Sequence, residues 1–379
     1  MQPTADHKIG AVSRIKSLNL GLIRILKMER RGKLSNFLAT TFGLAVTLGV
    51  AYLLAIILIF FLSKDPGRTI YYFFLGPFTN MYYFGNMLNA SVPVALAGLG
   101  IIIAFKSSMF NLGGEGQIYS GALVVTAVCL ALPGMNGYLG VFLGLAAGMA
   151  AGGILAGLSG FLKMKWGTNE LISSFMISGA AVLIVNYFIT GPMDDPINNL
   201  LATCRVGDQY CLMRIFRPSN LNIGAVLAIL MTGLVYFLMY YTRWGYEIRM
   251  CGENREFARY GGINISVYMV LPMILSGALQ GLAGGVVVLG THHMVIKEFT
   301  IGIGWKGIAV ALVARNQPLG AIPAAILFAY LDAGAKAAMI HSDVTYEISS
   351  IIQSIIFYLV TAQAIYSFVS RRRKEKDPA

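Results

Sequence analysis

The fold is decided by residues 37–62, FLATTFGLAVTLGVAYLLAIILIFFL, which are 26 consecutive residues without a charge. About 20 apolar residues are enough for a helix to cross the hydrocarbon core of a bilayer. The run is too long for a signal peptide, follows 36 residues of basic leader and ends without a small-residue cleavage site. We therefore predict that it is the first of several transmembrane helices.

The composition of the whole chain agrees with this interpretation. Its 379 residues are 56% hydrophobic and 12% charged, whereas soluble globular domains carry about 25% charged residues. A soluble protein is thereby excluded. Apolar windows predict an all-α integral membrane protein of about ten transmembrane helices. They lie at residues 37–63, 86–106, 117–132, 137–162, 168–190, 221–241, 265–291, 300–314, 319–340 and 346–369.

The basic residues indicate how the chain is oriented. With the N-terminus in the cytoplasm, 21 of the 29 Lys and Arg residues lie in segments placed inside and 6 in segments placed outside. Because positive residues favour the cytoplasmic side, we predict that both termini are cytoplasmic. Residues 1–36 and 370–379 are then basic cytoplasmic segments that flank a membrane domain at 37–369. The net charge of +12 reflects topology, and no nucleic acid is expected as a partner.

No motif for nucleotide hydrolysis or metal binding occurs in the chain. The GxxxxGK[ST] pattern is absent, and the four His residues have no metal-ligand spacing. We expect no catalytic residue, no metal and no bound cofactor, so any ATP must be used by a partner chain. Four Cys residues are too few for a disulfide framework. Cys204 and Cys211 share a predicted outer loop, where their spacing permits pairing without requiring it.

Two glycine-rich segments in the two halves of the chain are similar. FNLGGEGQI at residues 110–118 resembles FTIGIGWKGI at residues 299–308. In the predicted topology the first lies at the inner end of a span and the second at the outer end, as an inverted internal repeat requires. Glycine-interrupted segments at corresponding positions point to a central site formed by broken helices. Chance similarity is the alternative.

Glycines also recur at intervals of four within two predicted spans. They are Gly140, Gly144, Gly148 and Gly152 in one span, and Gly277, Gly281 and Gly285 in the other. Small residues at this spacing let helix backbones approach closely in lipid. We interpret both stripes as packing surfaces, with a lining of the substrate path as the alternative.

Ionisable residues at membrane depth are costly and are usually functional. The candidates are Glu115, Glu170, Lys306, Asp332 and Lys336. For Glu115 and Lys306, a place on a solute path and an ion pair between helices are equally compatible with the sequence. Asp332 and Lys336 stand four residues apart, so we predict an ion pair on one helical face.

The segment 243–264, RWGYEIRMCGENREFARYGGIN, is amphipathic and mixed in charge. A solvated loop or a helix at the lipid surface would suit this composition. Its dense alternating charge, together with Phe257 and Tyr260, instead favours a short helix that docks into a groove on a partner.

The order of these motifs resembles one family. The matching segments are FNLGGEGQ at 110–117, GTNELISSFM at 167–176, GENREFARYGGIN at 252–264 running into LSGALQGLAGG at 275–285, and GWKGIAVALVARNQPLGAIPAA at 304–325. Together they resemble the permease subunits of ATP-binding-cassette importers for nucleosides and simple sugars, the branched-chain amino acid and ribose type. Nucleoside permeases are the most similar branch.

The resemblance implies a set of partners. Two cytoplasmic ABC ATPase subunits would drive transport, a second permease, identical or different, would complete the pore, and an extracytoplasmic substrate-binding protein or lipoprotein would deliver the solute. The loop near 242–264 would couple the permease to the ATPase. Its coupling residues would be Gly252, Glu253, Asn254, Arg255, Arg259, Gly262 and Ile263. Glu256 and Phe257 are bulkier than the small residues usual in the family, which leaves open which ATPase fits.

The resemblance further implies alternating access for a nucleoside, with riboflavin and monosaccharides as alternatives. We predict that the solute path includes Asn111, Glu115, Gln117, Asn169, Glu170, Trp305 and Lys306. An ion-driven secondary transporter is a rival, for which Glu115 is the best carboxylate. A membrane-embedded enzyme is a weaker rival, for which His292 and His293 with Glu298 would be the candidate catalytic residues. The expected location is the cell membrane.

Overall fold

The computed structural model of the chain describes residues 49–359, except 51, 62, 197–199, 301 and 349. It divides into two compact units, and Ala55–Phe357 holds the elements discussed below. In the other unit, Met1–Leu54 with Tyr358–Ala379, the described residues are helical. The predicted segments 1–36 and 370–379 lie outside the described residues, as does most of the first predicted span.

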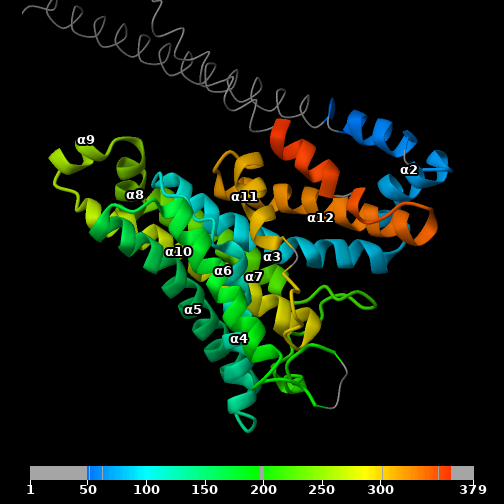
Figure 1. Cartoon of the computed structure of the whole chain (residues 1–379), viewed down its shortest axis with the longest axis horizontal. Coiled ribbons are helices and arrows are strands. Elements are labelled where there is room, and N and C mark those ends of the chain that lie inside the picture. Colours follow the sequence, from blue (N-terminus) through cyan, green and yellow to red (C-terminus); the bar gives the residue numbers. More distant parts are fainter. Residues whose placement is uncertain are drawn as a thin grey trace, which may run out of the picture. The chain divides into compact units, whose positions relative to one another are not determined.

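The described part of the chain is built from helices. Its isolated β-bridges lie in the long loop after α6, and one of them joins Ala202 of this loop to Ile296 after α10. Seven helices in it are long and apolar enough to cross a membrane (Figure 1). They are α3 (Met81–Lys106), α4 (Gly114–Ala131), α5 (Gly137–Trp166), α6 (Glu170–Ile189), α7 (Gly224–Tyr241), α10 (Ile265–Val287, continued by a π-helix at Val288–His292) and α12 (Pro318–His341). Seven of the predicted spans coincide with these helices, which confirms the all-α membrane fold.

The predicted span at 300–314 differs from the observed structure. The helix there, α11, covers only Ile303–Val313. Its 11 residues rise about 16 Å, roughly half the thickness of the hydrocarbon core. Two further short apolar helices, Tyr52–Phe61 and Ser350–Leu359, fall within the first and last predicted spans. A count of ten spans and the cytoplasmic placement of both termini stay predictions.

Several helices begin where an asparagine accepts the first free N–H groups. Asn136 accepts from Tyr138 at the start of α5, and Asn169 accepts from Leu171 at the start of α6. Asparagine is among the best residues at this position because its side-chain oxygen replaces the missing carbonyl partner. α5 ends at Gly167, whose φ of 67° favours glycine. These signals set the turns between the long helices.

The core of the bundle is formed by α3 and α10. Of their most apolar windows, 78% and 83% of the residues are buried, against 28% for α6 and α7. α10 packs against α3, α4 and α5 (Figure 1). α3 contacts α11 and α12 as well, and α12 also packs on α2 (Pro66–Leu75). The outer helices α6 and α7 therefore leave apolar faces for lipid or for other chains.

The two predicted glycine stripes face each other across the contact between α5 and α10. A Cβ added at Gly277 would collide with the carbonyl of Gly152, and one added at Gly281 would collide with that of Gly148. The backbones therefore touch directly, as small residues in membrane helices permit. The interpretation of these glycines as packing surfaces is confirmed.

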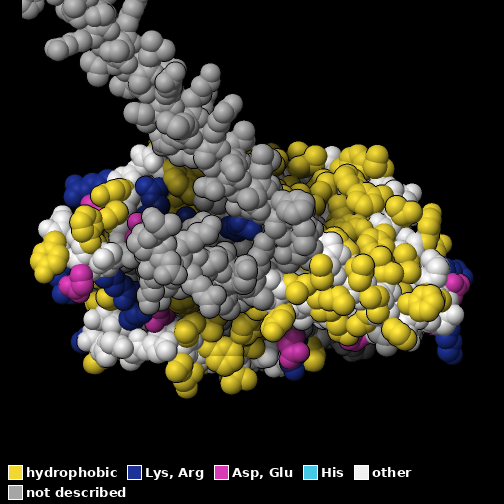
Figure 2. All heavy atoms as spheres, turned by 90° about the horizontal axis from the view of Figure 1, so that it is seen from above, with side chains coloured by type: hydrophobic (Ala, Val, Ile, Leu, Met, Phe, Trp, Pro, Cys, Tyr) yellow, Lys and Arg dark blue, Asp and Glu magenta, His cyan; other side chains and the backbone are white. Residues whose placement is uncertain are grey.

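The described surface is largely apolar on the face shown in Figure 2, where hydrophobic side chains form broad continuous areas. Charged side chains gather at the left of this view, at the end of the molecule that carries α8 (Arg243–Glu253) and α9 (Arg255–Tyr260). Such large exposed apolar areas are rare on soluble proteins. They are the surface expected of a protein surrounded by lipid.

Replacing Gly277 by Ala should destabilise the protein, because the new methyl group meets the backbone of Gly152, which cannot move aside. Overpacking of this kind costs about 1–3 kcal/mol. We expect the melting temperature of the purified protein in mild detergent to fall by several degrees. Gly233→Ala on α7 is the matched control, since no atom lies within 4 Å of its added Cβ. Equal melting temperatures for the two variants would contradict this packing.

Candidate functional site

Two helices begin inside the bundle, and their first residues meet there. A Cβ on Gly304 at the start of α11 would lie 2.6 Å from the backbone nitrogen of Glu115. A Cβ on Gly114, which opens α4, would lie 3.0 Å from the Cα of Gly304. The two glycine-rich segments that resemble each other in sequence are therefore neighbours in space. That they form an inverted repeat stays a prediction.

The carboxylate of Glu115 joins these two helix starts. Its Oε1 accepts the N–H of Gly304 at 2.9 Å and that of Trp305 at 3.5 Å. A carboxylate at a helix N-terminus satisfies free N–H groups and interacts favourably with the helix dipole. Glu115 thus caps α11, a contact that the sequence analysis did not anticipate.

Asn111 and Gln117 are buried and bonded to each other. Asn111 Nδ2 donates to Gln117 Oε1 at 2.8 Å, and Gln117 Nε2 donates to Asn111 Oδ1 at 2.9 Å. Asn111 also donates to the hydroxyl of Ser276 on α10 at 3.0 Å. The Asn111 carbonyl accepts the N–H of Gly113 at 3.0 Å as well. These amides fix the linker 107–113 between α3 and α4 onto the core.

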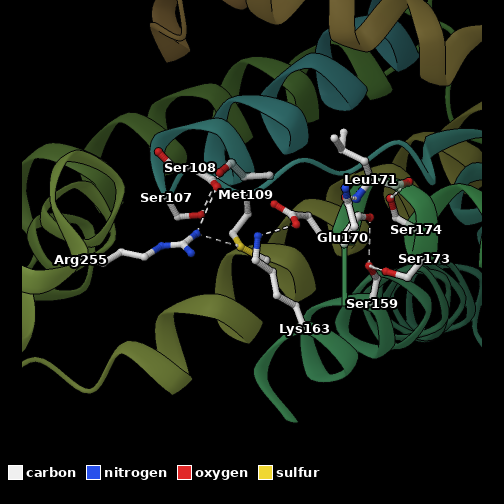
Figure 3. Close-up of polar contacts among 12 residues, drawn as sticks. Ser107, Ser108, Met109, Ser159, Lys163, Glu170, Leu171, Ser173, Ser174 and Arg255 are labelled. Atoms are coloured by element: carbon white, nitrogen blue, oxygen red, sulfur yellow. Dashed lines mark hydrogen bonds and ion pairs between the residues drawn. The ribbon is translucent and has the colours of Figure 1, made fainter. Parts of the chain in front are cut away.

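Asn169 and Glu170 lie at the turn between α5 and α6. Asn169 caps α6, and Glu170, only 6% exposed, forms an ion pair with Lys163 of α5. Figure 3 shows this pair near Met109 of the linker, with Ser159 and Ser173 bonded beside it at 2.7 Å. A buried ion pair is strongly destabilised when one partner is removed.

Lys306 pairs with a partner that the sequence analysis did not foresee. Its Nζ lies 2.5 Å from Asp332 Oδ2, so the predicted pair of Asp332 with Lys336 is wrong. Asp332 also accepts from the hydroxyl of Tyr346 at 2.8 Å and from Nε2 of Gln353 at 2.7 Å. Lys336 instead lies over the ring of Tyr346, 5.8 Å from its centre. Lys306 of α11, distant in sequence, therefore takes the place that Lys336 was expected to occupy beside Asp332.

A cavity of about 810 Å³ opens above this ion pair. Its walls come from α3, from the π-helical end of α10, from the loop 293–300 and from α12. Lys306 lines it, but Asn86, Asn89 and Thr291 were missed from sequence, and His292 was named only for the rival enzyme. The available signal was uncharged polar residues three apart in an apolar helix, as at Asn86 and Asn89. Trp305 lines a second cavity of about 400 Å³.

The predicted docking segment forms two short helices, α8 and α9, joined at Asn254, which caps α9 through the N–H of Phe257. Phe257 and Tyr260 project outward with 60% and 89% of their surfaces exposed. On α9, Arg259 pairs with Glu256 at 3.6 Å. The helical prediction for this segment is confirmed, and its role in docking stays a prediction.

The same segment is fastened to the linker before α4. The hydroxyl of Ser108 donates to the carbonyl of Gly252 at 2.6 Å, and Arg255 donates to the carbonyl of Ser108 at 3.3 Å (Figure 3). Gly252 lies so close to Lys106 that a Cβ would collide with the Lys106 carbonyl. The chain then turns at Gly262, whose φ is 77°, and Ile263 N–H closes the turn on Ala258. Among these coupling residues, Glu253 is the last residue of α8 and Arg259 lies in the last turn of α9.

Two of the cysteines lie in the long loop after α6, and one of them contacts His293, which follows the π-helix. Cys204 and Cys211 are free thiols, and Cys211 Sγ lies 3.2 Å from Nδ1 of His293. Burial raises the pKa of the Cys211 thiol, so the neutral form is favoured. Within the described residues, no three His, Cys, Asp or Glu side chains come together as metal ligands.

The fold and the site are those of a helical membrane permease. The described residues contain no nucleotide-binding domain. Residues 83–361 match the family described as "Branched-chain amino acid transport system / permease component". The chain belongs to this family of ABC transporter permeases and is a multi-pass protein of the cell membrane. No solved structure matches the chain.

Three relatives carry names that indicate their solutes. The chain is 34% identical to the probable riboflavin import permease of Treponema pallidum, over 84% of each chain. It is 30% identical to the guanosine ABC transporter permease of Bacillus subtilis, over 79% of this chain and 87% of the relative. It is 28% identical to the glucose ABC transporter permease of Haloferax volcanii, over 80% and 82% of the two chains.

Replacing Glu115 by Ala should destabilise the protein, because the first N–H groups of α11 lose their acceptor inside the bundle. Loss of a capping group costs about 1–2 kcal/mol. Glu115→Gln retains an acceptor oxygen and should lose less. Melting temperatures in detergent measure both effects, with Glu256→Ala, which removes an exposed pair, as a control expected to change little. A Glu115→Ala protein as stable as the control would exclude the capping contact.

Proposed function

We propose that the chain is the transmembrane permease subunit of an ABC importer and moves a nucleoside-like solute by alternating access, with ATP hydrolysed by separate subunits. The observation that carries the proposal is the α8–α9 segment. In a chain of the permease family, it presents two exposed aromatic residues outward and is bonded inward to the linker that precedes α4. Apolar side chains exposed on a polar helix pair suit a groove on a partner.

The orientation we propose places α8, α9 and both termini in the cytoplasm. The excess of Lys and Arg in the segments on that side supports it. The long loop after α6 then lies outside, where it would meet the substrate-binding protein or lipoprotein. A second permease, as a copy or a different chain, would pack on an apolar face of this one. No cofactor is assigned to this chain.

Coupling would run from the ATPase to the centre through three consecutive contacts. Movement of α9 would displace the carbonyl of Ser108 through Arg255. The linker would carry this displacement to Asn111, which is bonded to α10. Beyond it, Glu115 holds the first residues of α11. A change at the cytoplasmic end can thus alter the packing of α11, as alternating access requires.

The predicted path residues fall into two groups. Lys306 and Trp305 line cavities, which supports direct contact with the solute. Asn111, Glu115, Gln117, Asn169 and Glu170 hold the elements around those cavities, which supports a positioning role. A nucleoside is favoured by the FNLGGEGQ and GTNELISS motifs together and by a relative named for guanosine. Riboflavin and monosaccharides are the alternative solutes.

Purification in mild detergent from native cells, followed by mass spectrometry, tests this function. We expect a Walker-A-containing ATPase to copurify with the wild-type protein and to be lost from the Phe257→Ala/Tyr260→Ala double variant. Tyr138→Ala is the control, because Tyr138 is 91% exposed but lies outside the coupling segment. Recovery of this chain alone, with ion-driven uptake in liposomes, would replace the proposal by a secondary transporter.

A further inference from the structure

The cavity of about 810 Å³ is lined along one side by a stripe of α3. Tyr82, Asn86, Asn89 and Pro93 follow one another at intervals of three or four, so they share one face of the helix. The neighbouring residues of α3 are apolar and serve the core. Two amides on a membrane helix need hydrogen-bond partners to offset the cost of burying them, and Asn86 accepts the N–H of Asn220 at 2.9 Å.

The adjoining wall is formed where α10 changes from an α-helix to a π-helix at Val288–His292. Such π segments are rare and occur frequently at functional sites. His293 directly after it and Glu298 in the following loop have φ values of 59° and 60°, a strained region for residues other than glycine. This irregular backbone directs Thr291 and His292 to the cavity.

The polar groups of the two walls are held in fixed orientations. Asn89 Nδ2 donates to the hydroxyl of Thr291 at 3.0 Å, and Asn89 Oδ1 accepts from Asn222 at 2.9 Å. Asn222 in turn donates to the carbonyl of Gly290 in the π-helix at 3.0 Å. Because Asn89 uses one N–H for Thr291, its second N–H and the Thr291 hydroxyl proton stay available to a solute in the adjoining cavity.

Aromatic rings complete the walls. The ring of His292 meets that of Phe299 edge to face at 5.9 Å, and Phe299 is supported from behind by Tyr119 at 5.7 Å. Tyr82 and Tyr83 line the cavity from α3. Aromatic faces bind flat rings, whereas a free monosaccharide carries hydroxyl groups around its whole edge and needs partners on all sides. Here the amides and the hydroxyl are confined to one side.

The floor of the cavity is the pair of Lys306 and Asp332, held in place by Tyr346 and Gln353. Lys306 and Tyr346 also line the second cavity of about 400 Å³, which Phe328, Trp305 and Leu112 enclose on the other side. Lys306 and Tyr346 therefore lie between the two cavities, with Asp332 holding Lys306 from the side of the first. The two charges of the Lys306–Asp332 pair compensate each other. The other charged residues of the lining are Lys297 and Glu298, which carry opposite charges, and Lys336, which lies over the ring of Tyr346.

We propose that this cavity is the solute-binding site, that it takes an uncharged heterocyclic solute such as a nucleoside or a flavin, and that the Lys306–Asp332 pair closes it towards the second cavity. The volume lies in the range of small-molecule sites, about 300–1,000 Å³. Asn89 and Thr291 bond the polar edge of the ring, and the aromatic pair of His292 and Phe299 packs against one of its faces. This inference rests on the proposed function.

Uptake into proteoliposomes that contain the complete importer, with ATP inside, tests the site. The probes are guanosine, riboflavin and glucose. We expect Asn89→Ala and Thr291→Val each to raise the KM for guanosine or riboflavin about ten-fold, because each removes a bond to the solute. Asn136→Ala and Thr190→Val, on residues that do not line the cavity, are the matched controls and should keep the wild-type KM. An unchanged KM in both site variants would overturn the inference.

Solute protection gives a second measurement that does not depend on removing a hydrogen bond. In a chain whose four native cysteines are replaced, Ala333→Cys places a thiol in the cavity wall and Thr190→Cys places one elsewhere. We expect guanosine or riboflavin, but not glucose, to slow maleimide labelling at position 333 several-fold, with no effect at 190.

The outcomes distinguish the two proposals. Uptake of guanosine or riboflavin without protection at position 333 overturns the site alone. Uptake and protection by glucose overturns the assignment of a heterocycle. If the wild-type complex takes up none of the three solutes with ATP, the proposed function falls, and the site assignment falls with it.

Discussion

The structure depends on satisfying the backbone of two helices that begin inside the bundle. Each helix start leaves N–H groups without intrahelical partners, and in hydrocarbon each such group costs several kcal/mol. Glu115 accepts those of α11, while Ser178 accepts the N–H of Gly116 in α4. Since Gly114 and Gly304 touch, neither break can move without the other. The linker 107–113 leads into this contact from α3, and Lys306 of the cavity lies two residues after Gly304.

The sequence predicted what depends on local pattern. Apolar length located the long helices, and glycine spacing identified the contact of α5 with α10. It did not predict what depends on distant neighbours. Asp332 pairs with Lys306 because α11 lies beside α12. The late start of α11, at Ile303, was likewise not visible in the apolar pattern. Asn89 and Thr291 carry no signal alone, since their significance comes from a bond across 202 residues.

The proposed mechanism combines two kinds of contact. The coupling segment is joined to the linker by two hydrogen bonds in which side chains, the Ser108 hydroxyl and the Arg255 guanidinium, donate to backbone carbonyls. The floor is joined by side chains alone, with a charge pair as its central element. Bonds of the first kind tie the linker backbone to the coupling segment, whereas a charge pair has an alternative state in which its groups are solvated. In the proposed mechanism, displacement begins at the coupling segment and opens the cavity at the Lys306–Asp332 pair.

The direct backbone contact of α5 with α10 has an evolutionary consequence. Because those glycines leave no side chains to repack, the scaffold of α4, α5 and α10 tolerates few replacements there. The cavity takes its residues from α3, from the last turn of α10 and from α12, outside that contact. Solute preference can thus diverge by substitution in the cavity while the scaffold is inherited unchanged. This separation gives a physical reason why relatives named for guanosine, riboflavin and glucose can share one architecture.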